Sequence, residues 1–137
     1  MEFLLFLSEQ WLLVSILLVL VALLVFTESR KGGAAIGVHE LTRLVNSENA
    51  LVLDLRESKE FAAGHITGAI NIPFAKFKDR AAELEKYRNK PIILVDKMGQ
   101  HASSTGNQLA RDGYAVRRLR GGMSEWTGQN LPVIKGQ

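Results

Sequence analysis

The chain has 137 residues, of which 47% are hydrophobic and 23% are charged, so it has room for one modest folded domain and a short appendage. It contains no cysteine, which excludes disulfides, thiolate metal sites and any reaction that needs a thiolate nucleophile. All 17 basic residues but only 11 of the 14 acidic residues lie from Arg30 onward, which gives this part of the chain a formal charge of +6.

This positive charge does not indicate nucleic-acid binding. Lys and Arg are mixed with acidic residues along the chain, and only Arg117, Arg118 and Arg120 crowd together. Aromatic residues do not interleave with them to form a stacking platform for bases. Attraction to an anionic membrane face explains the charge more simply, and we expect no nucleic-acid partner.

Residues 11–26, WLLVSILLVLVALLVF, form an apolar run in which Ser15 is the only polar residue. As a helix this run is about 24 Å long, and its neighbours extend it toward the roughly 30 Å of the hydrocarbon core. It is apolar on all sides, which disfavours a helix that lies flat on the membrane surface. We therefore predict an uncleaved transmembrane anchor over residues 1–29.

Two other interpretations of this run are less favourable. A cleaved signal peptide would have a basic start, whereas Glu2 and Glu9 make this one acidic. A buried core helix would need a larger domain to cover it on every side. Arg30 and Lys31 follow the run, so the bias of basic residues predicts a single-pass protein of the inner (plasma) membrane, with its N-terminus outside and its C-terminal domain in the cytoplasm.

We predict a short linker over residues 30–35 and one α/β domain over residues 36–135. Apolar runs predict strands at 50–55, 69–73, 91–95 and 115–119. Helical patterns and stop signals predict helices at 38–46, 57–64, 79–88 and 103–113, and a last helical piece after the paired glycines. Asp79 is the predicted cap of the third helix, and Gly113 ends the fourth. This alternation favours a parallel sheet that is covered on both faces.

Three stretches of the domain carry a resemblance to a known family. Residues 53–73, LDLRESKEFAAGHITGAINIP, contain Asp-x-Arg, Gly-His-Ile and Gly-Ala-x-Asn-Ile-Pro, and residues 119–133, LRGGMSEWTGQNLPV, contain paired glycines, a tryptophan and Leu-Pro. Between them, PIILVD has the spacing of an active-site strand and loop. Residues 34–135 together resemble the rhodanese homology domain, and the whole chain is similar to single-domain membrane-anchored rhodanese-like proteins of bacteria. The resemblance implies a five-stranded parallel sheet between helices.

In that family, the residue after the central strand is a cysteine that becomes a persulfide during sulfur transfer. Its position falls on Asp96 here, and the equivalent of the active loop is Asp96, Lys97, Met98, Gly99, Gln100, His101 and Ala102. Active members commonly end this loop with an arginine that holds an anionic donor, where this chain has His101. A carboxylate cannot carry a persulfide, and it competes with an anion for the loop amides. We therefore expect a pseudoenzyme with no catalytic nucleophile, no cofactor and no small-molecule substrate.

Asp96 and His101 leave open a second hypothesis, an enzyme of the sulfurtransferase-like class with unconventional chemistry. Together with Ser103, Ser104 or Thr105 they suggest a catalytic triad. The structural interpretation is that Asp96 accepts hydrogen bonds from its own loop and that Ser103 or Ser104 caps the next helix. Asp96 and His101 offer two metal ligands without a third, so no metal site is expected.

The other signature residues are expected to be structural. Asp54, Arg56 and Glu60 are predicted to form a hydrogen-bonded charge cluster, and His65 is predicted to form hydrogen bonds in the turn that contains Gly64. Gly121 and Gly122 fit a turn that brings backbone close to the loop, Trp126 fits the core, and His39 is predicted to face solvent.

Lys97, Met98, Gln100 and His101 would form a flexible, mixed surface if the loop is exposed, and such surfaces suit protein contact. The sequence therefore predicts a membrane-anchored, catalytically inactive rhodanese-like domain. We expect it to act as a protein-binding or regulatory module at the cytoplasmic membrane face, with the bilayer and a membrane-associated protein as its partners.

Overall fold

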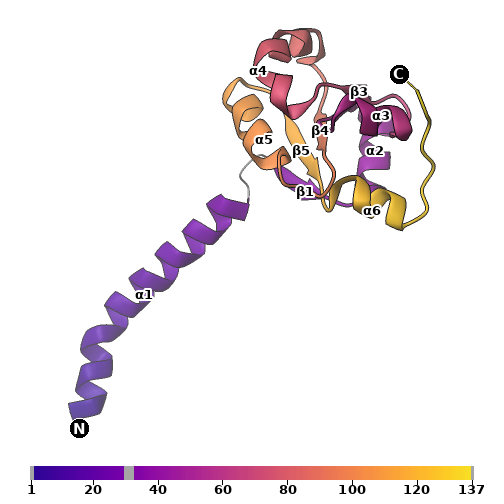
Figure 1. The fold of residues 1–137 in the computed structure, drawn as a ribbon. Helices are drawn as coiled ribbons and strands as arrows, with labels where there is room; N and C mark the ends of the chain where they lie inside the picture. The colour runs from indigo at the N-terminus through magenta and orange to yellow at the C-terminus, as the bar shows by residue number, and fades with distance from the viewer. Residues whose placement is uncertain (1, 30–32, 137) are drawn as a thin grey trace. The chain divides into compact units, whose positions relative to one another are not determined.

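A computed structural model of the chain describes residues 2–29 and 33–136 (Figure 1). Its contacts divide the chain into two units, residues 1–30 and residues 31–137. The first unit contains one helix, α1 (Glu2–Ser29). The 25 residues Glu2–Phe26 of α1 have a mean hydropathy of 2.4. No residue in the most apolar stretch of this span is buried by other parts of the protein. By length and composition, α1 is sufficient to span a membrane.

The second unit is built on a five-stranded sheet in which every neighbouring pair is parallel. The strand order is β1-β5-β4-β2-β3, with β1 (Ala34–Ile36), β2 (Leu51–Asp54), β3 (Ile70–Asn71), β4 (Ile92–Val95) and β5 (Val116–Leu119). This confirms the predicted fold class. The predicted linker is wrong at its end, because Ala34 and Ala35 pair with Arg117 and Arg118 of β5. The rest of that linker, residues 30–32, lies outside the described residues.

The helices that cover the sheet are short. They are α2 (Val38–Glu48), α3 (Ser58–Ala63), α4 (Phe77–Arg80), α5 (Ala102–Arg111) and α6 (Gly122–Gly128), with 3-10 helices η1 (Phe74–Lys76) and η2 (Ala81–Tyr87). Most lie where the sequence predicts helix. The single helix predicted over 79–88 is wrong: Arg80, with φ −112° and ψ 3°, interrupts it, and the chain continues as η2. Asp79 lies inside α4 and does not cap it.

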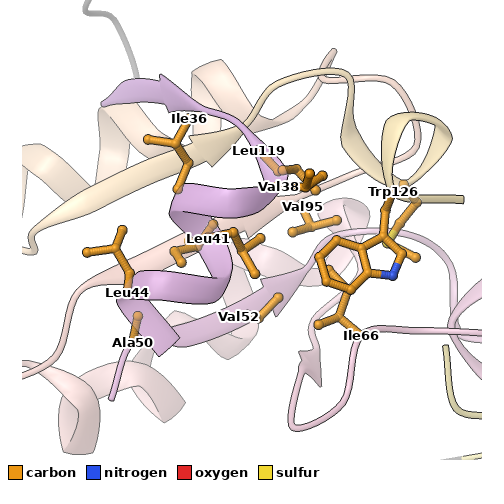
Figure 2. Close-up of a cluster of buried hydrophobic side chains, with 12 residues drawn as sticks. Ile36, Val38, Leu41, Leu44, Ala50, Val52, Ile66, Val95, Leu119 and Trp126 are labelled. Atoms are coloured by element: carbon orange, nitrogen blue, oxygen red, sulfur yellow. The ribbon is translucent and has the colours of Figure 1, made fainter. Parts of the chain in front are cut away.

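The core forms two layers, one on each face of the sheet. Along β4, Ile93 and Val95 face one layer while Ile92 and Leu94 face the other, and all four are fully buried. The first layer, drawn in Figure 2, receives side chains of α2 and α6, and the second receives side chains of α4, η2 and α5. Burial on both faces explains why β2 and β4 are continuous apolar runs in the sequence.

The parallel sheet has two distinct edges across its strands. The carboxyl ends of all strands meet at one edge, which we call the carboxyl edge, and their amino ends meet at the opposite amino edge. The loop after β4 and the segments after β2 and β3 therefore gather at the carboxyl edge. The chain arriving from the linker enters β1 at the amino edge.

Candidate functional site

The loop that follows β4, residues 96–102, is organised around the side chain of Asp96. This side chain is buried, with 2% of the residue exposed. Its Oδ1 accepts the N–H of Gly99, and its Oδ2 accepts the N–H groups of His101 at 2.6 Å and of Ala102 at 3.1 Å. The prediction that Asp96 bonds to its own loop is confirmed. Three donors suited to an external anion are thus engaged by a carboxylate of the chain itself.

The start of α5 differs from its predicted capping. The N-cap position is His101, without a side-chain cap, and Ser103 and Ser104 lie inside the helix. Arg118 Nη1 donates to Ser103 Oγ at 2.9 Å, and Ser104 Oγ donates to the His101 carbonyl at 3.2 Å. The prediction of a serine cap is therefore wrong. Asp96 supplies the acceptor instead, and its negative charge is favourable at the amino end of a helix.

The backbone of the loop is held by the first residues of α6. The carbonyl of Asp96 accepts the N–H of Met123 at 2.8 Å, and the carbonyl of Lys97 accepts the N–H of Ser124 at 3.0 Å. Gly122 has φ 57°, and a Cβ at this residue would overlap the Asp96 carbonyl oxygen. The prediction that Gly121 and Gly122 bring backbone close to the loop is confirmed, because any larger residue at 122 would push the loop away.

A cavity of about 270 Å³ lies between the 96–102 loop and the segments that follow β2 and β3. Its lining includes Arg56, Glu60 and five residues of the loop, all singled out by the sequence analysis. It also includes Phe74, which the sequence analysis missed: its ring stacks on that of His101, with centroids 4.1 Å apart and planes 19° apart. Met98 is 62% exposed at the rim. The cavity therefore has a mixed aromatic, thioether and charged lining.

The charge cluster at the end of β2 is a buried ion pair. Asp54 is 1% exposed, and Arg56 binds it through Nη2 at 2.7 Å and through Nε at 3.0 and 3.1 Å. Arg56 Nη2 also donates to the carbonyl of Gly64 at 2.7 Å. The predicted cluster is confirmed for Asp54 and Arg56. It is wrong for Glu60, which forms no ion pair with Arg56 in the described part of the chain and lines the cavity instead.

The remaining signature residues have structural contacts. His65 is buried, its Nδ1 lies 2.8 Å from the carbonyl of Phe61, and its ring stacks on Phe61. Trp126 is buried in the core layer of Figure 2, and its Nε1 donates to the carbonyl of Pro132 at 3.0 Å. His39 is exposed at the start of α2. These predictions are confirmed.

The loop does not assemble the triad that its residue types suggest. The carboxylate of Asp96 is engaged by backbone amides, the ring of His101 stacks on Phe74, and the hydroxyl of Ser103 accepts from Arg118. Thr105 is buried, and its hydroxyl has no partner among residues 2–29 and 33–136. Within the same residues, no group of three or more His, Asp or Glu is placed to hold a metal ion.

Comparison with known proteins identifies the domain. Residues 37–129 match the family model of the rhodanese-like domain. An uncharacterized protein of Escherichia coli K12, YibN, is 42% identical over 100 residues, which cover 72% of this chain and 70% of that protein. A sulfurtransferase of Allochromatium vinosum is 30% identical over 93 residues, covering 67% of this chain and 85% of that one.

The fold comparison agrees. The crystal structure of a rhodanese-related protein from Thermoplasma volcanium superimposes with a TM-score of 0.67 and 26% identity, and the match covers 73% of this chain and 96% of that one. The signature stretches around β2, β4 and α6 form the cavity wall, the 96–102 loop and the helix that holds this loop. The sequence has no cysteine at any position. The chain therefore belongs to the rhodanese-like domain family, as a member that lacks the active-site cysteine.

Proposed function

We propose that the chain is a membrane-anchored rhodanese-like domain without sulfurtransferase activity, which binds a membrane-associated protein through its 96–102 loop. One observation carries this proposal: the carboxylate of Asp96 accepts three loop amides in the place where the family holds its nucleophile. A hard, buried carboxylate offers neither a persulfide carrier nor an empty anion site. The cleft then remains available as a surface for binding a protein.

The anchoring half of the proposal rests on α1. The span Glu2–Phe26 would be about 38 Å long as a helix, which exceeds the roughly 30 Å hydrocarbon core. Arg30 and Lys31 follow it, while its start is acidic. This bias supports a location in the bacterial inner membrane with the rhodanese-like domain at the cytoplasmic face.

The binding half of the proposal rests on the rim of the cavity. Lys97, Met98, Gln100 and His101 are all exposed, and they stand beside the exposed ring of Phe74. A methionine adapts to a partner surface, and an aromatic pair offers a rigid apolar contact. Because the loop is tied to α6 and to Asp96, these side chains are presented on a fixed backbone, which lowers the entropic cost of binding.

We expect the full chain in detergent to show no thiosulfate:cyanide sulfurtransferase activity above background. The Asp96→Cys and Asp96→Cys/His101→Arg variants should also lack clear turnover, because position 96 is buried beneath its own loop and the thiol would not be accessible to an anionic donor. Thiocyanate formation measures this directly.

An Asp79→Cys variant is the matched control, since residue 79 is exposed and is not among the residues that line the cavity. It reports the background rate of an added thiol in the same chain. Turnover by the unsubstituted chain well above that rate would overturn the absence of sulfurtransferase activity.

Replacing Lys97, Met98, Gln100 and His101 together with alanine should reduce partner capture about tenfold, because truncating an energetically important interface side chain costs more than about 1 kcal/mol and a loss of about 1.4 kcal/mol is tenfold in affinity. The measurement is crosslinking of the full chain in native membranes, followed by quantitative mass spectrometry of the captured proteins. The control variant replaces exposed residues of similar types elsewhere on the domain, namely Lys59, Val133, Gln129 and His39. An unchanged partner list and yield for the loop variant would contradict binding through the loop.

A further inference from the structure

The amino edge of the sheet is where the chain arrives from α1. Gly33 lies directly before β1, Arg118 Nε donates to its carbonyl at 3.0 Å, and a Cβ at Gly33 would overlap the carbonyl of Val116. These contacts fix the arriving chain against the start of β5. The 96–102 loop lies at the carboxyl edge, which is the opposite end of every strand in a parallel sheet.

The amino edge carries a cluster of exposed basic side chains. We call it the amino-edge surface, and it consists of Lys86, Arg88, Lys90, Arg111 and Arg117. Lys86 and Lys90 place their Nζ atoms 5.4 and 5.9 Å from the ring centroid of Tyr87. Arg88 Nη1 donates to the carbonyl of Asp112, the residue after Arg111, at 2.6 Å. Arg117 is paired with Ala34 in the sheet.

Carboxylates balance only part of this charge. Glu85 pairs with Arg88 at 2.8 Å, and the hydrogen bond from this guanidinium lowers the pKa of the Glu85 carboxyl. Within the described part of the chain, no carboxylate forms an ion pair with Lys86, Lys90 or Arg111. Glu83 and Glu40 also lie near Lys86 and Arg117, but they form ion pairs with Arg80 and Arg43. Glu48 and Asp112 precede β2 and β5 and lie at this edge as well. The amino-edge surface therefore keeps an excess of positive charge, and the ring of Tyr87 lies close to the ammonium groups of Lys86 and Lys90.

The tether limits how far this surface can be from a bilayer that holds α1. Ser29 and Ala34 are five residues apart in the sequence, and an extended chain advances at most about 3.6 Å per residue, so the tether reaches about 18 Å. This reach applies to the start of β1, and the basic surface at the same edge can turn toward anionic head groups. The attraction extends over about one Debye length, roughly 8 Å at physiological salt.

We propose that the amino-edge surface docks on the anionic lipid head groups of the membrane in which α1 is anchored. This inference rests on the membrane anchoring of the proposed function and adds a defined orientation to it. The docked domain presents its carboxyl edge, and with it the 96–102 loop, to the aqueous side. The loop is then accessible to a protein partner at a fixed height above the membrane.

The test uses the full chain reconstituted in phosphatidylcholine vesicles with or without phosphatidylglycerol. Because the chain has no cysteine, Asn89→Cys gives a single fluorophore position within the amino-edge surface, and Ser58→Cys gives one at the carboxyl edge. Nitroxide attached to lipid head groups quenches a fluorophore that lies close to the membrane. We expect phosphatidylglycerol to increase quenching at position 89 and not at position 58, and ionic strength near 1 M to abolish the increase.

The decisive variant replaces Lys86, Lys90 and Arg111 with glutamine. Each basic residue close to an anionic surface contributes about fivefold to binding, so the docking equilibrium should fall about a hundredfold. The matched control replaces three exposed lysines on segments after β2 and β3, namely Lys59, Lys76 and Lys78, which changes the net charge equally and should leave quenching at position 89 intact.

Two results would overturn the inference. One is quenching at position 89 that is equal with and without phosphatidylglycerol, and the other is an equal loss in the two triple variants. If alkaline carbonate extracts the unsubstituted chain from its membranes, the anchor of the proposed function fails and this inference fails with it. A chain that stays inserted and captures its partner while showing no lipid-dependent quenching removes the docking inference alone.

Discussion

The Asp96→Ala variant is expected to unfold with a free energy about 3 kcal/mol lower than that of the unsubstituted chain. Alanine removes the acceptor of three backbone N–H groups, and charge-assisted hydrogen bonds of this kind contribute about 1.5–3 kcal/mol each when buried. The expected loss is smaller than the sum of the three hydrogen bonds, because water can solvate part of the opened loop. The measurement is urea unfolding of the full chain in detergent. Unfolding is monitored by the fluorescence of Trp126, in a variant in which Trp11→Phe removes the other tryptophan.

Two comparisons make this result specific to the carboxylate. Asp96→Asn keeps one carbonyl acceptor and should lose about half as much stability, whereas Asp79→Ala, an exposed aspartate, should change stability by less than about 0.5 kcal/mol. Hydrogen exchange at the amides of Gly99, His101 and Ala102 should accelerate most in Asp96→Ala, less in Asp96→Asn, and not at all in Asp79→Ala. If the stability and these three exchange rates stayed at their original values, Asp96 would not organise the loop.

The role of Asp96 was predictable from sequence because its physical cause is local. An aspartate that follows a buried strand and precedes a glycine-bearing loop readily accepts N–H groups a few residues later in the chain. The helix cap was not predictable in the same way. Ser103 and Ser104 are good capping residues by type, but the amides at the start of α5 already have the Asp96 carboxylate as an acceptor. Whether a serine hydroxyl or the Asp96 carboxylate accepts these amides depends on the geometry of the loop, which the sequence does not show.

Other features were missed because their causes lie far away in the sequence. Ala34–Ile36 is only three residues long and shows no strand periodicity, and it becomes a strand by pairing with β5, more than eighty residues later. Phe74 follows Pro73, which ends the first signature stretch, and has no distinguishing neighbours. Only the adjacency of β2, β3 and β4 at the carboxyl edge brings it onto His101.

The continuous apolar strands were predictable for the opposite reason. A parallel strand covered on both faces needs apolar residues at every position, and Ile92–Val95 satisfies this without reference to its partners. Asn71 lies between these cases. It belongs to a signature stretch, yet its role depends on the sheet, where its Nδ2 donates to the carbonyls of Asp54 at 3.0 Å and Arg56 at 2.9 Å. These bonds hold β3 to the end of β2 and so position the cavity wall.

The Arg56→Met variant should lose about 3–5 kcal/mol of unfolding free energy, because it leaves the Asp54 carboxylate buried without its guanidinium partner. It also removes the donor to the Gly64 carbonyl, which ties the end of α3 to the cavity wall. Urea unfolding monitored as for Asp96→Ala measures the loss. The large value follows from burial, since Asp54 is 1% exposed and cannot be rehydrated without opening the end of β2.

A surface ion pair of the same chemistry provides the control. Arg80 pairs with Glu83 at 2.7 Å, but the two side chains are 38% and 51% exposed, so Arg80→Met should cost less than about 1 kcal/mol. The double variant Asp54→Asn/Arg56→Met removes the buried charge together with its partner and should recover about 2 kcal/mol relative to Arg56→Met. If Arg56→Met and Arg80→Met cost the same, the ion pair behind the cavity would contribute no more than a solvated one. The wall that carries Glu57 and Glu60 would then owe its position to Asn71 and the sheet alone.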